Sequence, residues 1–268
     1  MDTVAHPPAT IEGWYASHQL FSLPRASHST ESELAAAREA LADIACGPSG
    51  SWSMAVPLVG SLADVMLMHF RPTLDELGIA ERRVRRDPFL GRLEPVYSFL
   101  SVTEAGLYHI TAQLAKDAAA RGGSVGDAEF EKSLAERSAA EEATPHVRRR
   151  LFPQPPADMP YVCFYPMSKR RAPDQNWYSL TLEERSRLMY SHGLVGRRYA
   201  GRVMQIITGA IGLDAWEWGV TLFAKDPLDF KKLVTDMRFD ETSARYADFG
   251  NFYVGKRAEP GEWPGEGR

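Results

Sequence analysis

The pattern of apolar and polar positions along the chain predicts one series of elements twice. In the first round, Thr30 with Glu33 and Thr73 with Glu76 form capping-box pairs, which predict helices ending near Gly47 and Arg86. Four segments rich in aromatic and apolar residues are typical of strands: 11–23, 51–60, 64–71 and 95–104. The predicted order is β-α-β-β-α-β.

The second round repeats this order. Thr181 and Glu184 form another capping box, for a helix that we expect to run to about His192. Asp226 and Pro227 are a good N-cap and first-turn pair for the other helix. Four segments are again predicted as strands: 159–167, 200–209, 215–224 and 243–255. Two such units predict an α+β fold of two ferredoxin-like halves packed through their sheets.

The same pattern divides the chain into four parts. Residues 1–104 form the first half and 159–257 the second, while 105–158 form an Ala- and charge-rich connector that we expect to be partly helical or mobile. The polar tail 258–268 is predicted to be disordered. At 268 residues and 44% hydrophobic content, the chain can bury a good core.

Charge and composition exclude several classes of protein. Residues 148–202 contain eleven Lys and Arg against four Asp and Glu, whereas the whole chain has a net charge of −4. The basic stretch could serve nucleic acid, an anionic small molecule or an exposed face, but the acidic whole argues against a general nucleic-acid binder. No run of eighteen apolar residues predicts a membrane span, and the first residues lack the pattern of a secretory signal. Cys46 and Cys163 form no metal or redox motif, so we expect a cytoplasmic protein.

One histidine stands in unusual surroundings. Leu188, Met189 and Val195 place His192 on an apolar helix face, where an isolated histidine is most often a core residue bonded to a carbonyl. Gly193 and a second glycine at 196 remove side chains beside it, so a broad, flat ligand could approach the backbone. His192 is therefore a candidate iron ligand.

Gln205 is a polar residue within the apolar segment "VMQIITG". Alternation places it on one strand face with Val203 and Ile207. Taken alone, Gln205 is best explained as an amide paired across the sheet, and the functional alternative is a neutral donor lining an apolar pocket.

Longer motifs favour a functional role for His192 and Gln205 over a purely structural one. The second half carries a series of segments in fixed order: "YPMSKRR", "NWY", "LMYSHGLVGRRYAGRVMQIITG", "WEWGVTLF" and "MRFDETSARYADFG". This series resembles the chlorite dismutase-like superfamily of the dimeric α/β-barrel type, and within it the coproheme decarboxylases, the peroxide-dependent haem synthases. The resemblance is dense in the second half and reaches the first half through its topology and "EGWY".

The resemblance implies a role for each matching residue. His192 matches the proximal iron ligand, Tyr165 the catalytic tyrosine, and Lys169 a lysine at the reacting propionates. Gln205 occupies the distal position, where chlorite dismutases have an arginine, and indicates the glutamine-bearing branch of the decarboxylases. The remaining matches are propionate-binding or pocket-mouth residues: Arg150 (with Arg149 as the alternative), Arg197 and Ser243.

The implied reaction converts two propionates of iron coproporphyrin III (coproheme) to vinyl groups with hydrogen peroxide and yields haem b. Coproheme is then both substrate and redox cofactor, and its four propionates need charge-assisted partners in a protein cleft. The resemblance also implies a homopentamer and a transient contact with ferrochelatase.

Two alternatives stay open from the sequence. One is a haem enzyme that acts on chlorite or on peroxide alone, against which Gln205 and Tyr165 argue. The other is a non-catalytic haem-binding protein on the same scaffold, which would need His192 but neither Tyr165 nor Lys169.

Overall fold

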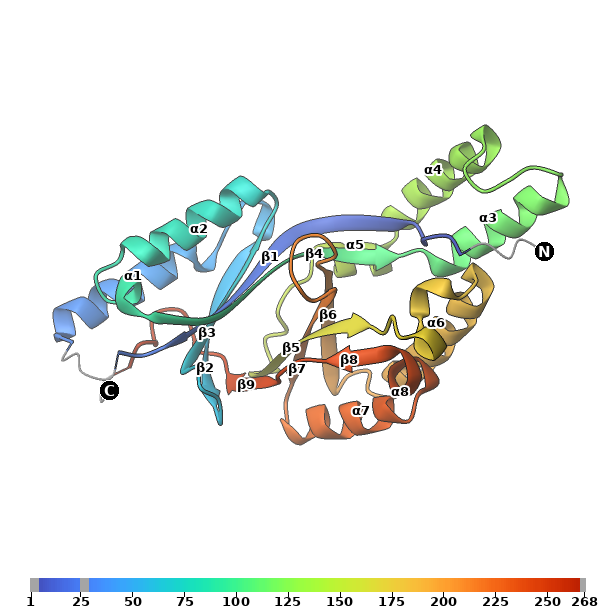
Figure 1. The fold of residues 1–268 in the computed structure, drawn as a ribbon. Coiled ribbons are helices and arrows are strands. Elements are labelled where there is room, and N and C mark those ends of the chain that lie inside the picture. The colour runs from blue at the N-terminus through green and yellow to red at the C-terminus, as the bar shows by residue number, and fades with distance from the viewer. Residues whose placement is uncertain (1–4, 25–28, 266–268) are drawn as a thin grey trace.

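Strands and helices follow one another in two similar rounds joined by a helical connector (Figure 1). The computed structural model describes residues 5–24 and 29–265. The first round consists of β1 (Thr10–Ser22), α1 (Glu31–Ala45), β2 (Trp52–Val59), β3 (Val65–Arg71), α2 (Leu74–Arg86) and β4 (Glu94–Gly106). Short 3₁₀ turns occur at Pro48–Gly50, Leu90–Arg92, Pro173–Gln175 and Trp177–Ser179.

The connector and the second round complete the chain. The connector holds three helices, α3 (Tyr108–Ala120), α4 (Ala128–Glu142) and α5 (Pro145–Leu151). The second round consists of β5 (Tyr161–Lys169), α6 (Leu182–Arg197), β6 (Val203–Gly209), β7 (Trp218–Ala224), α7 (Leu228–Arg238), α8 (Glu241–Tyr246), β8 (Ala247–Phe249) and β9 (Tyr253–Lys256).

Each half has the strand order of a ferredoxin-like sheet, which confirms the predicted fold class. The first half runs β4-β1-β3-β2, and the second runs β6-β7-β5 with β8 and β9 both paired to β5. All of these pairings are antiparallel. The halves join at two seams, β4 with β6 and β2 with β9, so that the strands close into a ring.

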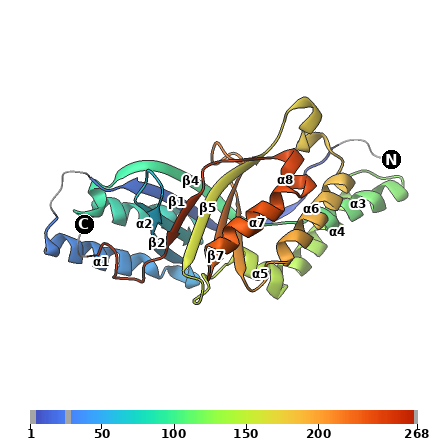
Figure 2. The same cartoon turned by 90° about the horizontal axis from the view of Figure 1, so that it is seen from below.

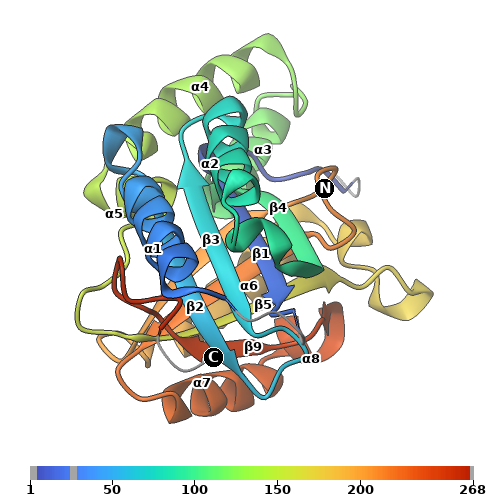
Figure 3. The same ribbon diagram turned by 90° about the vertical axis from the view of Figure 1, so that its left-hand side faces the viewer.

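The interior of this ring is apolar, and the helices cover its outer faces. Phe70 and Phe99 of the first half and Phe164 and Phe223 of the second meet in one fully buried cluster. Helices α1 and α2 cover the outer face of the first sheet, as Figure 3 shows. Seen from below, α6, α7 and α8 lie along the second half (Figure 2). The second sheet and these helices form the walls of the functional site.

Two predicted elements of the second half differ most from the structure, while the strands predicted at 200–209 and 215–224 only begin three residues later, as β6 and β7. Helix α6 continues beyond His192 to Arg197, because the turn that follows is anchored by Tyr199, which is buried and donates to Asp236 at 2.8 Å. The predicted strand 243–255 is wrong in its first part, since Asp240 caps helix α8 by accepting from the backbone N–H of Ser243.

The rest of that segment forms two strands with an interruption at Gly250. A Cβ on Gly250 would lie 2.7 Å from Cγ of Pro166, so a residue with a side chain could not approach β5 this closely. The first strand, β8, ends at Phe249, and the second, β9, begins at Tyr253.

The prediction of a disordered tail is wrong for residues 258–265. Ala258 donates its backbone N–H to the Ala55 carbonyl oxygen at 2.9 Å. Trp263 is only 4% exposed and packs edge-on against Phe89 in the core beneath α1 and α2. Residues 266–268 of the predicted tail lie outside the described residues.

Within residues 5–24 and 29–265, no helix combines the length and the apolar character needed to cross a membrane.

Candidate haem site

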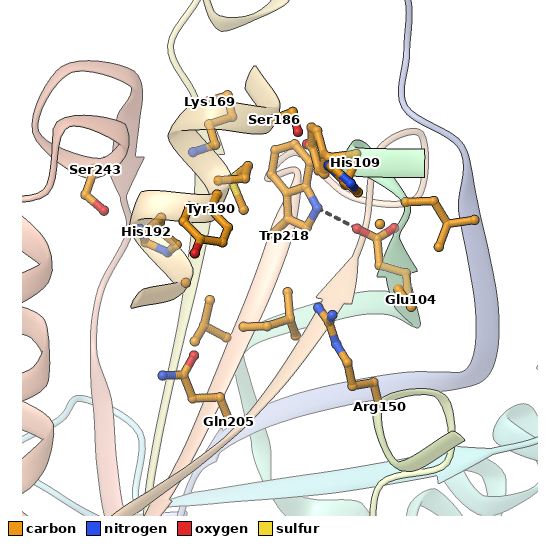
Figure 4. A pocket seen from close by; sticks show the side chains of 18 of the residues that line it. Glu104, His109, Arg150, Lys169, Ser186, Tyr190, His192, Gln205, Trp218 and Ser243 are labelled. Carbon is orange, nitrogen blue, oxygen red and sulfur yellow. Dashed lines mark hydrogen bonds between the residues drawn. The ribbon is translucent and has the colours of Figure 1, made fainter. Parts of the chain in front are cut away.

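A cavity of about 900 Å³ lies between the outer face of the second sheet and helices α6 and α7 (Figure 4). Connector helices α3 and α5 form a further wall, so this part of the chain contributes directly to the site. The volume is at the upper end of the range for small-molecule sites, roughly 300–1,000 Å³. The cavity is large enough for a bulky ligand.

His192 lines the cavity from α6, and one of its ring nitrogens already has a partner. Nδ1 lies 2.8 Å from Oδ2 of Asp240, which is itself almost fully buried. A carboxylate on one ring nitrogen orients the imidazole and leaves Nε2 as an electron-pair donor. His192, the predicted iron ligand, is therefore hydrogen-bonded to a carboxylate and not to a carbonyl oxygen.

Asp240 is held as an anion by several groups at once. Burial alone would raise the pKa of its carboxyl, but the hydrogen bond and charge of His192, the backbone N–H of Ser243 and the charge of Lys169 together lower it. Asp240 thus links α6, α8 and β5 at one end of the cavity.

Of the two glycines of α6, Gly193 leaves the backbone open to the cavity as the sequence predicts, whereas Gly196 is packed against a neighbouring side chain. A Cβ on Gly193 would find no neighbour closer than 4.0 Å and would point into unfilled space. A Cβ on Gly196 would meet Met237 at 3.3 Å and the amide of Gln205 at 3.8 Å. A flat ligand could therefore lie against this face of the helix.

Strand β5 delivers three side chains to the opposite wall. Tyr165, Met167 and Lys169 alternate along the strand and all line the cavity. The strand thus places the phenol of Tyr165 and the ammonium group of Lys169 on the same face, four residues apart.

Lys169 is an almost fully buried cation, with 8% of its surface exposed. Burial lowers the pKa of its ammonium group to about 8, although Asp240 and Glu217 act in the opposite direction. Nζ lies 4.3 Å from the centre of the Trp177 ring, a distance at which the ring face attracts a cation. Lys169 is poised to change charge near neutral pH.

Tyr165 is surrounded by aromatic rings. It stacks on Phe252 with a centroid distance of 4.4 Å, and Phe249 lies at 6.0 Å. Burial raises the pKa of its phenol well above the ordinary value, and Arg238 only partly offsets this. The hydroxyl therefore stays protonated at neutral pH.

Gln205 lines the cavity together with Ile207, as strand alternation predicts. Its amide nitrogen lies near Gly196, which follows His192 by one helical turn on α6. Its amide is exposed to the cavity and forms no cross-strand side-chain pair within the described part of the chain.

The predicted propionate-binding residues fall into two groups. Arg150 and Ser243 line the cavity, the first from α5 and the second from α8. Arg149 and Arg197 do not line it. The guanidinium of Arg197 instead lies 5.8 Å from the ring centre of Tyr190, which is a cavity residue, so Arg197 stands beside the rim.

Several residues in the cavity wall or directly behind it have no counterpart among the predicted ones. Asp240 could have been suspected from the spacing of "DETS", which is typical of an N-cap. Arg238 reaches the cavity from the end of α7, with its guanidinium 3.7 Å from the Phe249 ring centre. Glu104 enters from β4 of the first half and accepts a 2.8 Å hydrogen bond from Nε1 of Trp218. No local pattern indicates these last contacts, because they join distant segments.

The cavity has a cationic lining. Lys116 is neutralised by Glu183 at 2.9 Å, and Arg187 lies 3.7 Å from Glu241. Three other lining cations form no ion pair within the described ranges: Arg150, Lys169 and Arg238. A cavity lined by unpaired cations suits a ligand that carries several carboxylates.

The donor set also bears on the kind of metal group that fits. No cluster of three or more His, Cys, Asp or Glu that could hold a bare metal ion occurs in residues 5–24 and 29–265. Three histidines line the cavity, His109, His146 and His192. Of these, His192 has its Nδ1 held by the carboxylate of Asp240, an arrangement that suits binding of iron that a macrocycle already holds.

Comparisons with known proteins agree with this geometry. The sequence profile described as chlorite dismutase matches residues 31–258. A structure described as a novel haem-binding protein from Thermus thermophilus is 38% identical, with 96% of each chain covered and a TM-score of 0.78. A chlorite dismutase mutant from Candidatus Nitrospira defluvii is 17% identical, with 94% of each chain covered and a TM-score of 0.68.

The same Nitrospira enzyme in complex with imidazole is 17% identical, with 94% of this chain and 93% of that chain covered and a TM-score of 0.67. At this level of identity the Nitrospira structures establish the shared fold. The match over residues 31–258 and the 38% identical relative establish the family as well as the fold: the chain belongs to the chlorite dismutase family.

Proposed function

We propose that the protein removes the carboxyl groups of two propionates of iron coproporphyrin III, with hydrogen peroxide as the oxidant, and so produces haem b. The observation that carries this proposal is the presence of Tyr165 and Lys169 on one wall of the cavity that His192 enters from another. A haem carrier needs only the histidine.

The residues of the cavity fit such a ligand. His192, with Nδ1 occupied by Asp240, would bind the iron through Nε2, and the open face at Gly193 would accept the ring. Arg150, Lys169, Arg238 and Ser243 would bind propionates. When bound, the iron porphyrin supplies the two-electron redox chemistry with peroxide.

In the proposed reaction the hydroxyl of Tyr165 would first give up its proton and one electron to the oxidant. The resulting phenoxyl radical would then take a hydrogen atom from the β-carbon of a propionate, which restores the phenol. Loss of one further electron and of carbon dioxide then leaves the vinyl group. One peroxide per propionate accepts the two electrons and becomes two molecules of water, which consumes one proton beyond the proton lost by the propionate. Because the phenol of Tyr165 stays protonated at neutral pH, it can act as a hydrogen-atom relay.

Lys169 has a separate task. Its ammonium group would hold the reacting carboxylate while that group is an anion, or give it a proton. A buried lysine with a pKa of about 8 can do either near neutral pH. The neutral carbon dioxide that leaves then no longer binds the cation.

A chlorite-converting enzyme is the second candidate, because the family carries that name. Gln205 argues against it, since a neutral amide cannot stabilise an anionic oxidant as a guanidinium does. We also expect a homopentamer in the cytoplasm, with a transient contact to ferrochelatase, and these expectations stay predictions.

The decisive experiment combines the purified protein with ferric coproporphyrin III and peroxide and separates the porphyrins by mass. We expect two successive losses of formic acid mass equivalents (CO₂ and two hydrogens each) and accumulation of haem b. His192→Ala should remove the histidine-ligated absorption spectrum. Oxygen release from chlorite by the haem-loaded protein, without any haem b from coproporphyrin, would favour the second candidate instead.

A further inference from the structure

Glu217 is a buried carboxylate that the proposed reaction does not use. It stands immediately before β7 and is only 8% exposed. Its backbone N–H donates to the carbonyl oxygen of Met167 at 3.1 Å, and its carbonyl accepts from Ala210 at 2.8 Å. Backbone bonds to both neighbouring segments therefore fix its position.

The side chain of Glu217 turns to the end of β5. Its Oε2 accepts a 2.7 Å hydrogen bond from the backbone N–H of Lys169, the residue that ends the strand. A buried carboxylate needs such partners because desolvation of its charge is costly. Arg171 pairs with Glu217 from outside the cavity. This ion pair is weak, because the two groups lie 3.8 Å apart and the side chain of Arg171 is largely exposed.

Lys169 needs an anion, and few are within reach. Its ammonium group contacts the Trp177 ring and forms no ion pair with any described residue. Asp240 and Glu217 are the acids whose charges act on it, but Asp240 is shared with His192 and Ser243. Glu217 acts on Lys169 more weakly than Asp240 does, and its other side-chain partners are the exposed Arg171 and the phenol of Tyr178, so no buried cation neutralises it.

We propose that Glu217 is a positioning residue for Lys169, whose buried carboxylate anchors the strand end that carries the lysine and keeps the ammonium group charged before a ligand arrives. This role rests on the proposed function of Lys169 at the propionates. It makes the site ready to receive a carboxylate.

Other titratable groups surround this end of the cavity and must be considered with Glu217. They come from every neighbouring element: His192 and Arg185 on α6, Asp240 at the N-cap of α8, Tyr108 on α3, Arg238 on α7, and Arg171 and Tyr178 in the segment after β5. Of these, Asp240 acts on Lys169 in the same direction as Glu217. Removal of Glu217 should therefore lower the pKa of Lys169 without abolishing its charge at low pH.

The test follows the ionisation of Lys169 directly, in the protein without porphyrin. Lysine side chains are labelled by ¹³C reductive methylation and titrated by NMR, and Lys169→Arg identifies the resonance of interest. In the wild type the midpoint should lie near the pKa of about 8. In Glu217→Gln we expect it to fall by roughly one pH unit, as for loss of a nearby opposite charge.

Matched variants separate charge from packing. Asp248→Asn removes an acid that pairs with Arg170 beside the same strand end but is 57% exposed, so it should leave the midpoint unchanged. Glu217→Asp keeps the charge but shortens the side chain, and its midpoint should lie between those of wild type and Glu217→Gln. This variant also serves if Glu217→Gln does not fold.

An unchanged Lys169 midpoint in a folded Glu217→Gln protein, or in Glu217→Asp if only that variant folds, would overturn the proposal. The measurement uses neither coproporphyrin nor peroxide. Failure of the decarboxylation assay would therefore not affect the titration result. An unchanged midpoint would likewise leave the proposed decarboxylation untouched.

Discussion

Single side chains at one end of the cavity divide the proposed chemistry between them. Tyr165→Phe removes one hydroxyl and keeps the ring that stacks on Phe252. Binding of ferric coproporphyrin should stay within a few-fold of wild type, because the packing is nearly unchanged. Haem b formation should fall by at least a hundredfold, since the hydrogen-atom relay is lost. Titration by absorbance and porphyrin mass analysis measure the two effects, and normal turnover would refute the role of Tyr165.

Charge on a single lysine predicts a pH dependence of ligand binding. Burial lowers the pKa of Lys169 to about 8, so its ammonium group is charged below that pH and neutral above it. A bound carboxylate favours the charged form, so affinity for iron-free coproporphyrin should be full near pH 7 and decline as the pH rises through 8 and above. Fluorescence titration at a series of pH values measures this decline.

Lys169→Arg provides the control for the pH profile. A guanidinium keeps its charge throughout this range, so the decline between pH 8 and 10 should disappear. The same decline in both proteins would show that another group controls binding.

At the scale of an element, helix α6 combines a ligand-binding face with a stable N-terminus. The capping box of Thr181 and Glu184 fixes where the helix begins, and Gly193 leaves its cavity face bare. Gly193→Leu should therefore not destabilise the ligand-free protein, since glycine is about 1 kcal/mol less favourable than alanine inside a helix. The new side chain would fill the space intended for the ring.

We expect Gly193→Leu to weaken haem binding by more than tenfold while the thermal midpoint of the ligand-free protein stays equal or rises. Ser191→Leu is the matched control, because this exposed residue lies on the same helix and does not line the cavity. Equal haem affinity in both variants would mean that the ring does not lie against this face.

At the scale of the whole molecule, the chain end helps to hold the first half together. Trp263 packs against Phe89 in the cluster that joins α1 and α2 to the sheet, far from the cavity. Trp263→Ala should lower the free energy of unfolding by about 3 kcal/mol, as for other large-to-small core changes. Haem affinity at a temperature where the variant is folded should not change.

Denaturant unfolding measures the stability of Trp263→Ala. Glu262→Ala, a change at the neighbouring and exposed position, should have little effect. A wild-type unfolding curve for Trp263→Ala would mean that the tail does not contribute to the core.

Local sequence determined most of the elements and their order. Capping residues such as Thr30 and Thr181 bond to their own helices, and alternation is set by the two-residue repeat of a strand, so neighbouring residues suffice to predict both. The motif around His192 likewise indicates the family, to which the match over residues 31–258 assigns the chain. Helix α8 shows the limit, because six residues are too few for the period of a helix to be distinguished from that of a strand.

Tertiary structure alone decided which distant residues meet in and around the cavity. Asp240 meets His192 across 48 positions, and Glu104 meets Trp218 across 114, because the sheet seam and the helix packing bring them together. The choice of Arg150 over Arg149 as a lining residue likewise depends on how α5 is oriented against β4. The charge of Lys169 also depends on the fold. Its pKa is set by desolvation and by the nearby acids, and both act on the ammonium group only once the chain has folded.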